Sequence, residues 1–171
     1  MIELVLGGNK SGKSDFGLEL LRREPEPRAL VATGKSRDLA FREQIREHRQ
    51  GREAGIAVHE TDTDLVGTLR ALSPQGGGVL VDSLDFWMFA VMNHAGGRAA
   101  QERMREELLA ELSAWRGGRL ILVSTEMGLG PLAFDGSVRA FARDLGRLNR
   151  EIARVSTSVY LVIAGLPQKL K

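Results

Sequence analysis

The fold is decided at the start of the chain, by Ile2-Glu3-Leu4-Val5-Leu6 followed directly by Gly7-Gly8-Asn9-Lys10-Ser11-Gly12-Lys13-Ser14. The first five residues are typical of a buried strand, and the glycines after them permit a tight turn of the backbone. The spacing Gly-x-x-x-x-Gly-Lys-Ser is that of a P-loop, whose backbone N–H groups surround phosphate oxygens at a helix N-terminus. The sequence therefore predicts that residues 7–14 bind the phosphates of a nucleoside triphosphate.

Two side chains of this loop have specific expected roles. Lys13 is expected to reach the β- and γ-phosphates, which makes it a catalytic residue, and the Ser14 hydroxyl is expected to bind Mg²⁺. A chance match or an inactive loop is the alternative, and the strand before the motif and the helix after it argue against both. The predicted phosphate-binding residues are Gly7, Gly8, Asn9, Lys10, Ser11, Gly12, Lys13 and Ser14.

Strand and helix signals alternate along the rest of the chain. Apolar runs predict strands at 29–33, 79–81, 120–124 and 159–164, and residues 56–61 are weakly strand-like. Helical periodicity predicts helices after the P-loop and at 38–52, 65–72, 101–115 and 137–155. Such strands, separated by helices, predict an α/β fold of the P-loop type, a mostly parallel sheet with helices on both faces. We expect one domain over 1–171, because no repeat or linker divides the chain.

Composition excludes several classes of protein. The formal net charge of +2 is nearly balanced, so neither nucleic acid nor a membrane surface is predicted as a partner. The absence of cysteine excludes disulfides, thiolate nucleophiles and cysteine-bound metals. The first apolar run is too short for a signal peptide or a membrane span, so we expect a cytoplasmic location.

A carboxylate closes the apolar run at 79–81. Asp82 follows this strand at its carboxyl end, where α/β sheets bind ligands, and next to a P-loop it is expected to bind Mg²⁺. The alternative is that Asp82 caps the next helix through Ser83-Leu84-Asp85.

The histidines are ambiguous when the residues are considered alone. His48 lies on the predicted charged helix among Arg46, Arg49 and Arg52, which suit a polyphosphate, but such a histidine is ordinarily a solvated surface residue. His59 and His94 are expected to be structural, and Glu60 alone is a plain strand-end carboxylate.

Taken together, these segments resemble a family. The chain resembles the bifunctional adenosylcobinamide kinase/adenosylcobinamide-phosphate guanylyltransferases of cobalamin biosynthesis. It has, in the same order as that family, the P-loop, Ile45-x-x-His48-Arg49-x-x-Arg52, Glu60 and Val-Leu-Val-Asp82-x-Leu84-x-x-Trp87. The match continues with Val123-Ser124-x-Glu126-x-Gly128-Leu129-Gly130, Arg139-x-Phe141, Gly146-Arg147-Leu148-Asn149 and Ala164-Gly165-Leu166-Pro167, and with Lys171 at the end. The resemblance covers essentially the whole chain.

The resemblance implies two reactions. His48 would attack the α-phosphate of GTP, and the resulting guanylylated histidine would pass GMP to adenosylcobinamide phosphate. With Mg²⁺, the P-loop would orient GTP or ATP for phosphoryl transfer to adenosylcobinamide. The resemblance also implies a homotrimer. The implied nucleotide contacts beyond the P-loop are Ala32, Thr33, Gly34, Arg49, Gln50, Gly51, Arg52, Glu60 and Asp82.

The chain also departs from the family pattern, at Ala40, Phe41, Ile56, Asp85, Ala90, Thr125, Leu132, Ala133, Ala142 and Arg143. The family has threonine in place of Asp85 and asparagine in place of Thr125. These departures keep open a relative that transfers phosphate or GMP to another small molecule. A non-catalytic GTP-binding switch is a further alternative, against which the chain lacks an Asn-Lys-x-Asp segment that would read guanine.

Overall fold

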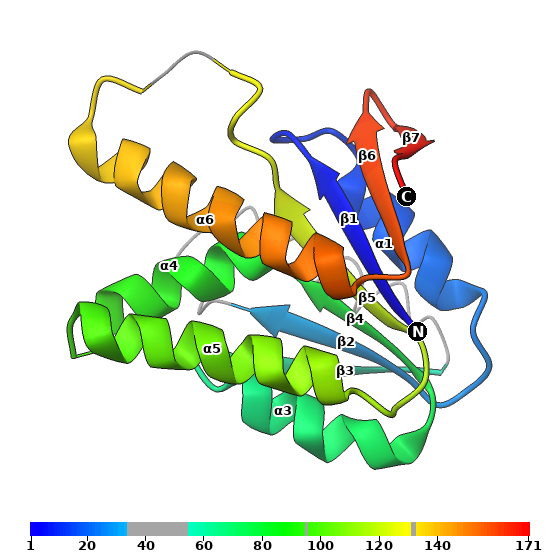
Figure 1. Ribbon diagram of the computed structural model, residues 1–171. Helices are drawn as coiled ribbons and strands as arrows, with labels where there is room; N and C mark the ends of the chain where they lie inside the picture. The colour runs from blue at the N-terminus through cyan, green and yellow to red at the C-terminus, as the bar shows by residue number, and fades with distance from the viewer. Residues whose placement is uncertain (34–54, 95, 131–132) are drawn as a thin grey trace.

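The centre of the molecule is a seven-stranded sheet in the order β3-β2-β4-β5-β1-β6-β7 (Figure 1). This computed structural model describes residues 1–33, 55–94, 96–130 and 133–171. All neighbouring strands are parallel except β7, which runs antiparallel to β6. The strands are β1 Ile2–Gly7, β2 Arg28–Thr33, β3 Ile56–Thr61, β4 Gly78–Asp82, β5 Leu120–Thr125, β6 Ser158–Ile163 and β7 Leu166–Lys169. The mostly parallel sheet predicted from the apolar runs is confirmed.

Helices cover both faces of this sheet. The helices are α1 Lys13–Arg22, α3 Leu65–Leu72, α4 Leu84–His94, α5 Arg98–Ala114 and α6 Gly136–Val155, with a short 3₁₀ helix η1 at Ser73–Gln75. Figure 1 shows α4, α5 and α6 in front of the sheet and α1 behind it. The helix predicted at 38–52 lies outside the described residues. Within the described ranges, no helix has the length and apolar character needed to cross a membrane.

The central strands β1, β2, β4 and β5 are largely continuous apolar runs because both of their faces are buried. Leu4 and Leu6 of β1 pack in the cluster under α3, α4, α5 and α6, whereas Val5 packs in the cluster under α1. The helix predicted at 101–115 is also confirmed as part of α5, whose Leu108 and Leu112 are buried in the first of these clusters. Burial on both faces removes the polar alternation that a half-exposed strand would show.

The sheet direction brings distant loops together. Because β1, β2, β3, β4, β5 and β6 are parallel, their carboxyl ends lie at one edge, and the segments after β1, β4 and β5 all leave the sheet there. The strand β5 pairs with β1 on one side and with β4 on the other. Ligands of open α/β sheets bind at the carboxyl ends of the strands, so a ligand site is expected at this edge.

Candidate active site

The P-loop connects β1 to α1 in the strand–loop–helix context that its motif requires. Gly12 is the N-cap of α1, with φ at 91° in the left-handed region that favours glycine. Within the loop the Ser11 N–H donates to the Gly8 carbonyl at 3.3 Å, and the Phe16 N–H donates to the Gly12 carbonyl at 3.0 Å. The helix N-terminus, which attracts anions, therefore begins at the end of the loop.

The loop has no room for a side chain at its start, and its lysine lies across it. A Cβ at Gly7 would overlap the Ser11 hydroxyl, so only glycine fits where the loop leaves β1. The Lys13 ammonium donates to the Gly8 carbonyl at 3.1 Å. Lys13 and Ser14 are both half-buried at the start of α1. The lysine is thus held over the loop where a phosphate would lie.

Three of the residues predicted to contact nucleotide lie in one row across the sheet. Ala32 of β2 is in register with Glu60 of β3 on one side and with Asp82 of β4 on the other. Ala32 is buried, Asp82 is half-buried and Glu60 is exposed. The fold therefore places these residues together at the carboxyl edge, although they are far apart in sequence.

Thr33 has a different position from the one expected of a solvent-facing nucleotide contact. It is fully buried, and its hydroxyl accepts from the Ser83 N–H at 2.8 Å and donates to the Ser83 carbonyl. The side chain therefore fixes the turn that follows Asp82. A nucleotide contact at Thr33 would have to come from its backbone.

The remaining predicted contacts fall outside the part of the chain that is described. These are Gly34, His48, Arg49, Gln50, Gly51 and Arg52, together with the departures Ala40 and Phe41. Of the other histidines, His59 is half-buried on β3, while His94 is exposed at the end of α4 with its Nε2 3.9 Å from Asp62 Oδ2.

A side-chain cluster at the end of β5 was not predicted from the sequence. Ser124 Oγ donates to Asn149 Oδ1 at 2.7 Å, and Asn149 Nδ2 donates to the Thr125 carbonyl at 3.1 Å. Thr125 Oγ1 in turn donates to Asp85 Oδ2 at 3.0 Å. We call these four residues the β5-end cluster. The only sequence signal for it was the inclusion of Ser124 and Asn149 in segments that resemble the family.

Two departures from the family pattern are partners in this cluster. Asp85 and Thr125, which stand where the family has threonine and asparagine, form the hydrogen bond described above. Threonine and asparagine can also donate and accept in such a pair. A hydrogen bond between the side chains at positions 85 and 125 can therefore form with either pair of residues. Neither departure indicates this when it is considered alone.

Glu126 lies between the P-loop and Asp82. Its N–H donates to the Gly7 carbonyl at 3.0 Å, and its Oε1 accepts from the Gly128 N–H at 2.8 Å. Because β5 separates β1 from β4, the first residue after β5 is adjacent to the start of the P-loop. Glu126 is thus a further carboxylate of this edge that sequence reasoning had not assigned to the site.

The donors at this edge fit Mg²⁺. Among the described residues no three histidine or acidic side chains gather closely enough to hold a metal by themselves. Mg²⁺ usually binds to one or two protein oxygens, several waters and the substrate phosphates. The hydroxyl of Ser14 and the carboxylate of Asp82 are oxygen ligands of the type that Mg²⁺ prefers.

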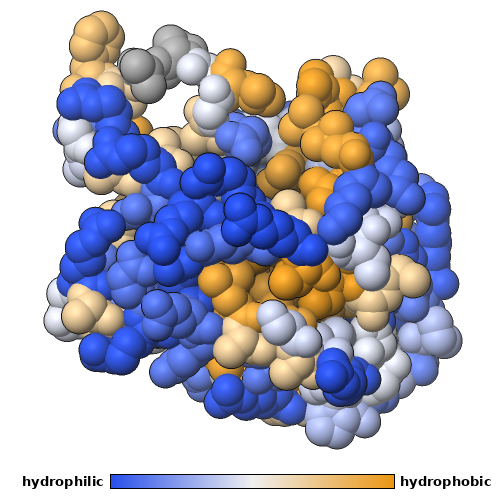
Figure 2. Space-filling view, viewed as in Figure 1, coloured by the Kyte–Doolittle hydropathy of each residue, from blue (hydrophilic) through white to orange (hydrophobic). Residues whose placement is uncertain are grey.

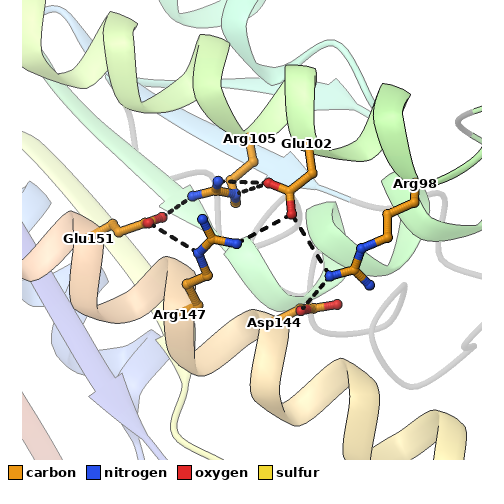
Figure 3. Close-up of polar contacts among 6 residues, drawn as sticks. All are labelled: Arg98, Glu102, Arg105, Asp144, Arg147 and Glu151. Atoms are coloured by element: carbon orange, nitrogen blue, oxygen red, sulfur yellow. Dashed lines mark hydrogen bonds and ion pairs between the residues drawn. The ribbon is translucent and has the colours of Figure 1, made fainter.

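An ionic network joins α5 to α6, which carries Asn149 (Figure 3). Arg105 contacts Glu102 at 2.7 Å and also pairs with Glu151. The hydrogen bond that Arg105 donates to Glu102 lowers the pKa of Glu102 below the ordinary value of 4.5. Burial opposes the charge of Arg105, but the hydrogen bonds to both carboxylates raise its pKa. The six residues are Arg98, Glu102, Arg105, Asp144, Arg147 and Glu151.

Comparisons with known proteins agree with the fold and with the motifs. Residues 3–170 match the family model described as cobinamide kinase / cobinamide phosphate guanyltransferase. The chain is 34% identical over its whole length to the bifunctional adenosylcobalamin biosynthesis protein CobP of Pseudomonas aeruginosa, of which it covers 98%. It is 26% identical to the bifunctional adenosylcobalamin biosynthesis protein CobU of Salmonella typhimurium, and both chains are fully covered.

A solved structure shares the fold at low sequence identity. The P4 protein from bacteriophage phi6, solved in complex with ADP, is 16% identical with a TM-score of 0.52 over 98% of this chain. This chain spans about half of that protein, 53% of its length. Such a likeness supports the P-loop fold, and the full-length family match supports the enzyme class. The chain belongs to the cobinamide kinase / cobinamide phosphate guanyltransferase family of cobalamin biosynthesis.

Proposed function

We propose that the P-loop serves both reactions of this chain and that GMP transfer passes through a guanylylated His48. The observation that supports the triphosphate site is the loop itself, and the role of His48 rests on the family resemblance. Lys13 lies over the loop, the N-terminus of α1 closes it, and Asp82 lies at the same edge of the sheet. This is an arrangement for holding a triphosphate, in a chain that matches the family over its length.

In the GMP transfer, one bond to phosphorus is exchanged at each step. A ring nitrogen of neutral His48 forms a bond to the α-phosphorus of GTP, the bond to the bridging oxygen breaks, and pyrophosphate leaves. An oxygen of adenosylcobinamide phosphate then attacks the same phosphorus, and the bond to nitrogen breaks. A neutral imidazole is a competent nucleophile near pH 7, so two easier displacements replace one.

In the kinase reaction, the P-loop positions GTP or ATP for attack by the hydroxyl of adenosylcobinamide on the γ-phosphorus. The bond from that phosphorus to the β,γ-bridging oxygen breaks, the nucleoside diphosphate leaves, and the hydroxyl proton is released to water. Phosphoryl transfer depends mainly on positioning and on charge stabilisation, both of which Lys13 and the loop amides supply. Ser14 and Asp82 would hold Mg²⁺, which offsets negative charge on the phosphates. We infer further contacts to the nucleotide from Ala32, Thr33, Gly34, Glu60 and residues 49–52, as the family resemblance implies.

Intact mass tests the nucleophile. After incubation with GTP and Mg²⁺, the wild type should gain the mass of one GMP, and His48→Ala should gain none. His48→Ala should still phosphorylate adenosylcobinamide, because that reaction needs no covalent intermediate. His59→Ala is the matched control on β3 and should keep both activities. The adduct should be labile in acid and stable in mild base, since protonation of the nitrogen makes it a good leaving group.

The same assay separates the alternatives. A wild type that never gains GMP, or a His48→Ala variant that still gains it, contradicts the proposed nucleophile. A GMP adduct that is not passed to adenosylcobinamide phosphate points to a different small-molecule acceptor. GTP binding without any transfer points to a non-catalytic switch.

The family resemblance also supports an oligomeric, cytoplasmic enzyme. We propose a homotrimer, and sedimentation velocity of the purified protein measures this directly. A monomer at the concentrations used for assays would contradict it.

A further inference from the structure

The C-terminal hairpin turns beside the P-loop strand. β6 pairs in parallel with β1, with Val162 in register with Gly7, and the chain then reverses into β7. The turn consists of Ala164 and Gly165, whose φ values are 51° and 79°. Two left-handed residues in sequence are typical of a tight hairpin turn that follows the twist of its strands. The turn therefore has a defined shape next to the start of the P-loop.

This turn contacts the P-loop through its backbone. The Gly165 N–H donates to the Ser11 carbonyl at 2.8 Å. A Cβ placed on Gly12 would lie 3.0 Å from the Gly165 Cα, which shows how closely the two segments approach. The hairpin turn is thus a wall of the loop, supplied from the far end of the sequence.

The hairpin is held in place by polar contacts rather than by burial of its outer side. The Lys171 ammonium donates to the Ser156 carbonyl at 2.7 Å and to the Ala153 carbonyl at 3.1 Å at the C-terminus of α6. The outer side chains Leu166 and Leu170 are exposed, and Figure 2 shows apolar surface over this hairpin at the upper right. Capping of the last helical carbonyls by Lys171 fixes the hairpin against the body of the protein.

We propose that the 164–165 turn is a positioning element that sets the phosphate-binding conformation of the P-loop. In a trans peptide, the carbonyl and the next N–H point in opposite directions. Because the Ser11 carbonyl is held toward Gly165, the Gly12 N–H is directed away from the hairpin and fixed in that orientation before any ligand binds. Preorganised donors reduce the ordering cost of binding. The inference rests on the proposed function of the P-loop as the triphosphate site.

The test compares left-handed glycines that differ in what they contact. Gly165 and Gly76 have φ values of 79° and 73°, and at both a Cβ would meet nothing within 4 Å. Valine disfavours this conformation at either place, whereas asparagine tolerates it. Gly165→Val should therefore disturb the turn, Gly165→Asn should preserve it, and Gly76→Val should impose a similar strain far from the P-loop contact.

The measurements are the Kd for GTP with Mg²⁺ by calorimetry, the thermal midpoint, and the KM and kcat of the kinase reaction. Gly165→Val should raise Kd and KM by about three- to tenfold, the effect of one lost hydrogen bond, and leave kcat unchanged. Gly165→Asn should bind as the wild type does. Gly76→Val should lower the thermal midpoint and leave Kd unchanged.

Unchanged Kd in a folded Gly165→Val variant, or an equal rise in Gly76→Val, overturns the inference. If Gly165→Val does not fold, Gly165→Ala takes its place, with a smaller expected rise in Kd, and an unchanged Kd there overturns the inference as well. A wild type that binds no GTP overturns the proposed function and this inference together. If the wild type binds GTP and the Gly165→Val variant binds it with the same Kd, only the inference is overturned.

Discussion

The P-loop and the β5-end cluster lie at the same edge of the sheet but are built in opposite ways. The P-loop is a continuous segment, residues 7–14, that presents mainly backbone groups together with the side chain of Lys13. The β5-end cluster joins Asp85, Ser124, Thr125 and Asn149 from three elements through their side chains. The first is specified by its local sequence, and the second exists only after α4, α6 and the sheet have packed.

This difference has a consequence for substitutions. A change in the P-loop removes groups that are proposed to contact the triphosphate, so it should affect binding and catalysis before stability. A change in the β5-end cluster leaves a buried polar group without its partner, which costs stability first. Substitutions at the two places should therefore separate an effect on ligand binding from an effect on folding.

Lys13→Ala should abolish measurable triphosphate binding and both activities, because the variant lacks the ammonium that we propose faces the β- and γ-phosphates. Its thermal midpoint should stay close to that of the wild type, since the polar contact of Lys13 is with the Gly8 carbonyl of its own loop. Calorimetry with GTP and a thermal melt provide the two readouts. Retained affinity would refute the P-loop assignment.

Asp82→Asn should lower kcat at limiting Mg²⁺ by about 10- to 100-fold while weakening nucleotide binding much less, because the ion acts mainly on charge that develops during transfer. Activity titrated against Mg²⁺ is the measurement. If activity at every Mg²⁺ concentration equals that of the wild type, Asp82 only supports the start of α4.

The double variant Asp85→Thr/Thr125→Asn should be closer to the wild type in stability than the sum of its single variants predicts. Each single change alters the size and geometry of one partner while the other stays as it is, whereas the double change replaces both partners of the hydrogen bond together. We expect a coupling free energy of about 0.5–3 kcal/mol, measured from urea unfolding of all four proteins. Strict additivity would mean that the two departures are unrelated.

Glu102→Gln should have the smallest effect, about 0.2–1 kcal/mol at pH 7, because the network it belongs to is partly solvated. The hydrogen bond from Arg105 lowers the pKa of Glu102, so the ionised form stabilises the fold above the ordinary pKa of 4.5. That contribution is lost as the pH falls through the lowered value. Thermal melts should therefore show the difference between variant and wild type shrinking in acid, and a constant difference would contradict this origin.

The sequence alone determined the features that depend on residues close together along the chain. The P-loop was readable because its glycines, lysine and serine act within one turn of chain, and the parallel sheet was readable because doubly buried strands are continuously apolar. The family followed from motifs in a fixed order along the chain. Asp82 was placed at the ligand-binding edge because a residue after a buried strand must lie there in such a fold.

Tertiary structure decided which distant residues meet. The Thr33 hydroxyl holds Ser83 because β2 and β4 are neighbours in the sheet, and the predicted nucleotide contact at Thr33 stays a prediction. The Asp85–Thr125 pair and the contact from Gly165 to Ser11 depend on strand order, which no local pattern encodes. Hydrogen bonds between residues far apart in sequence arise only once the hydrophobic faces have packed, so their partners could be assigned only from the folded chain.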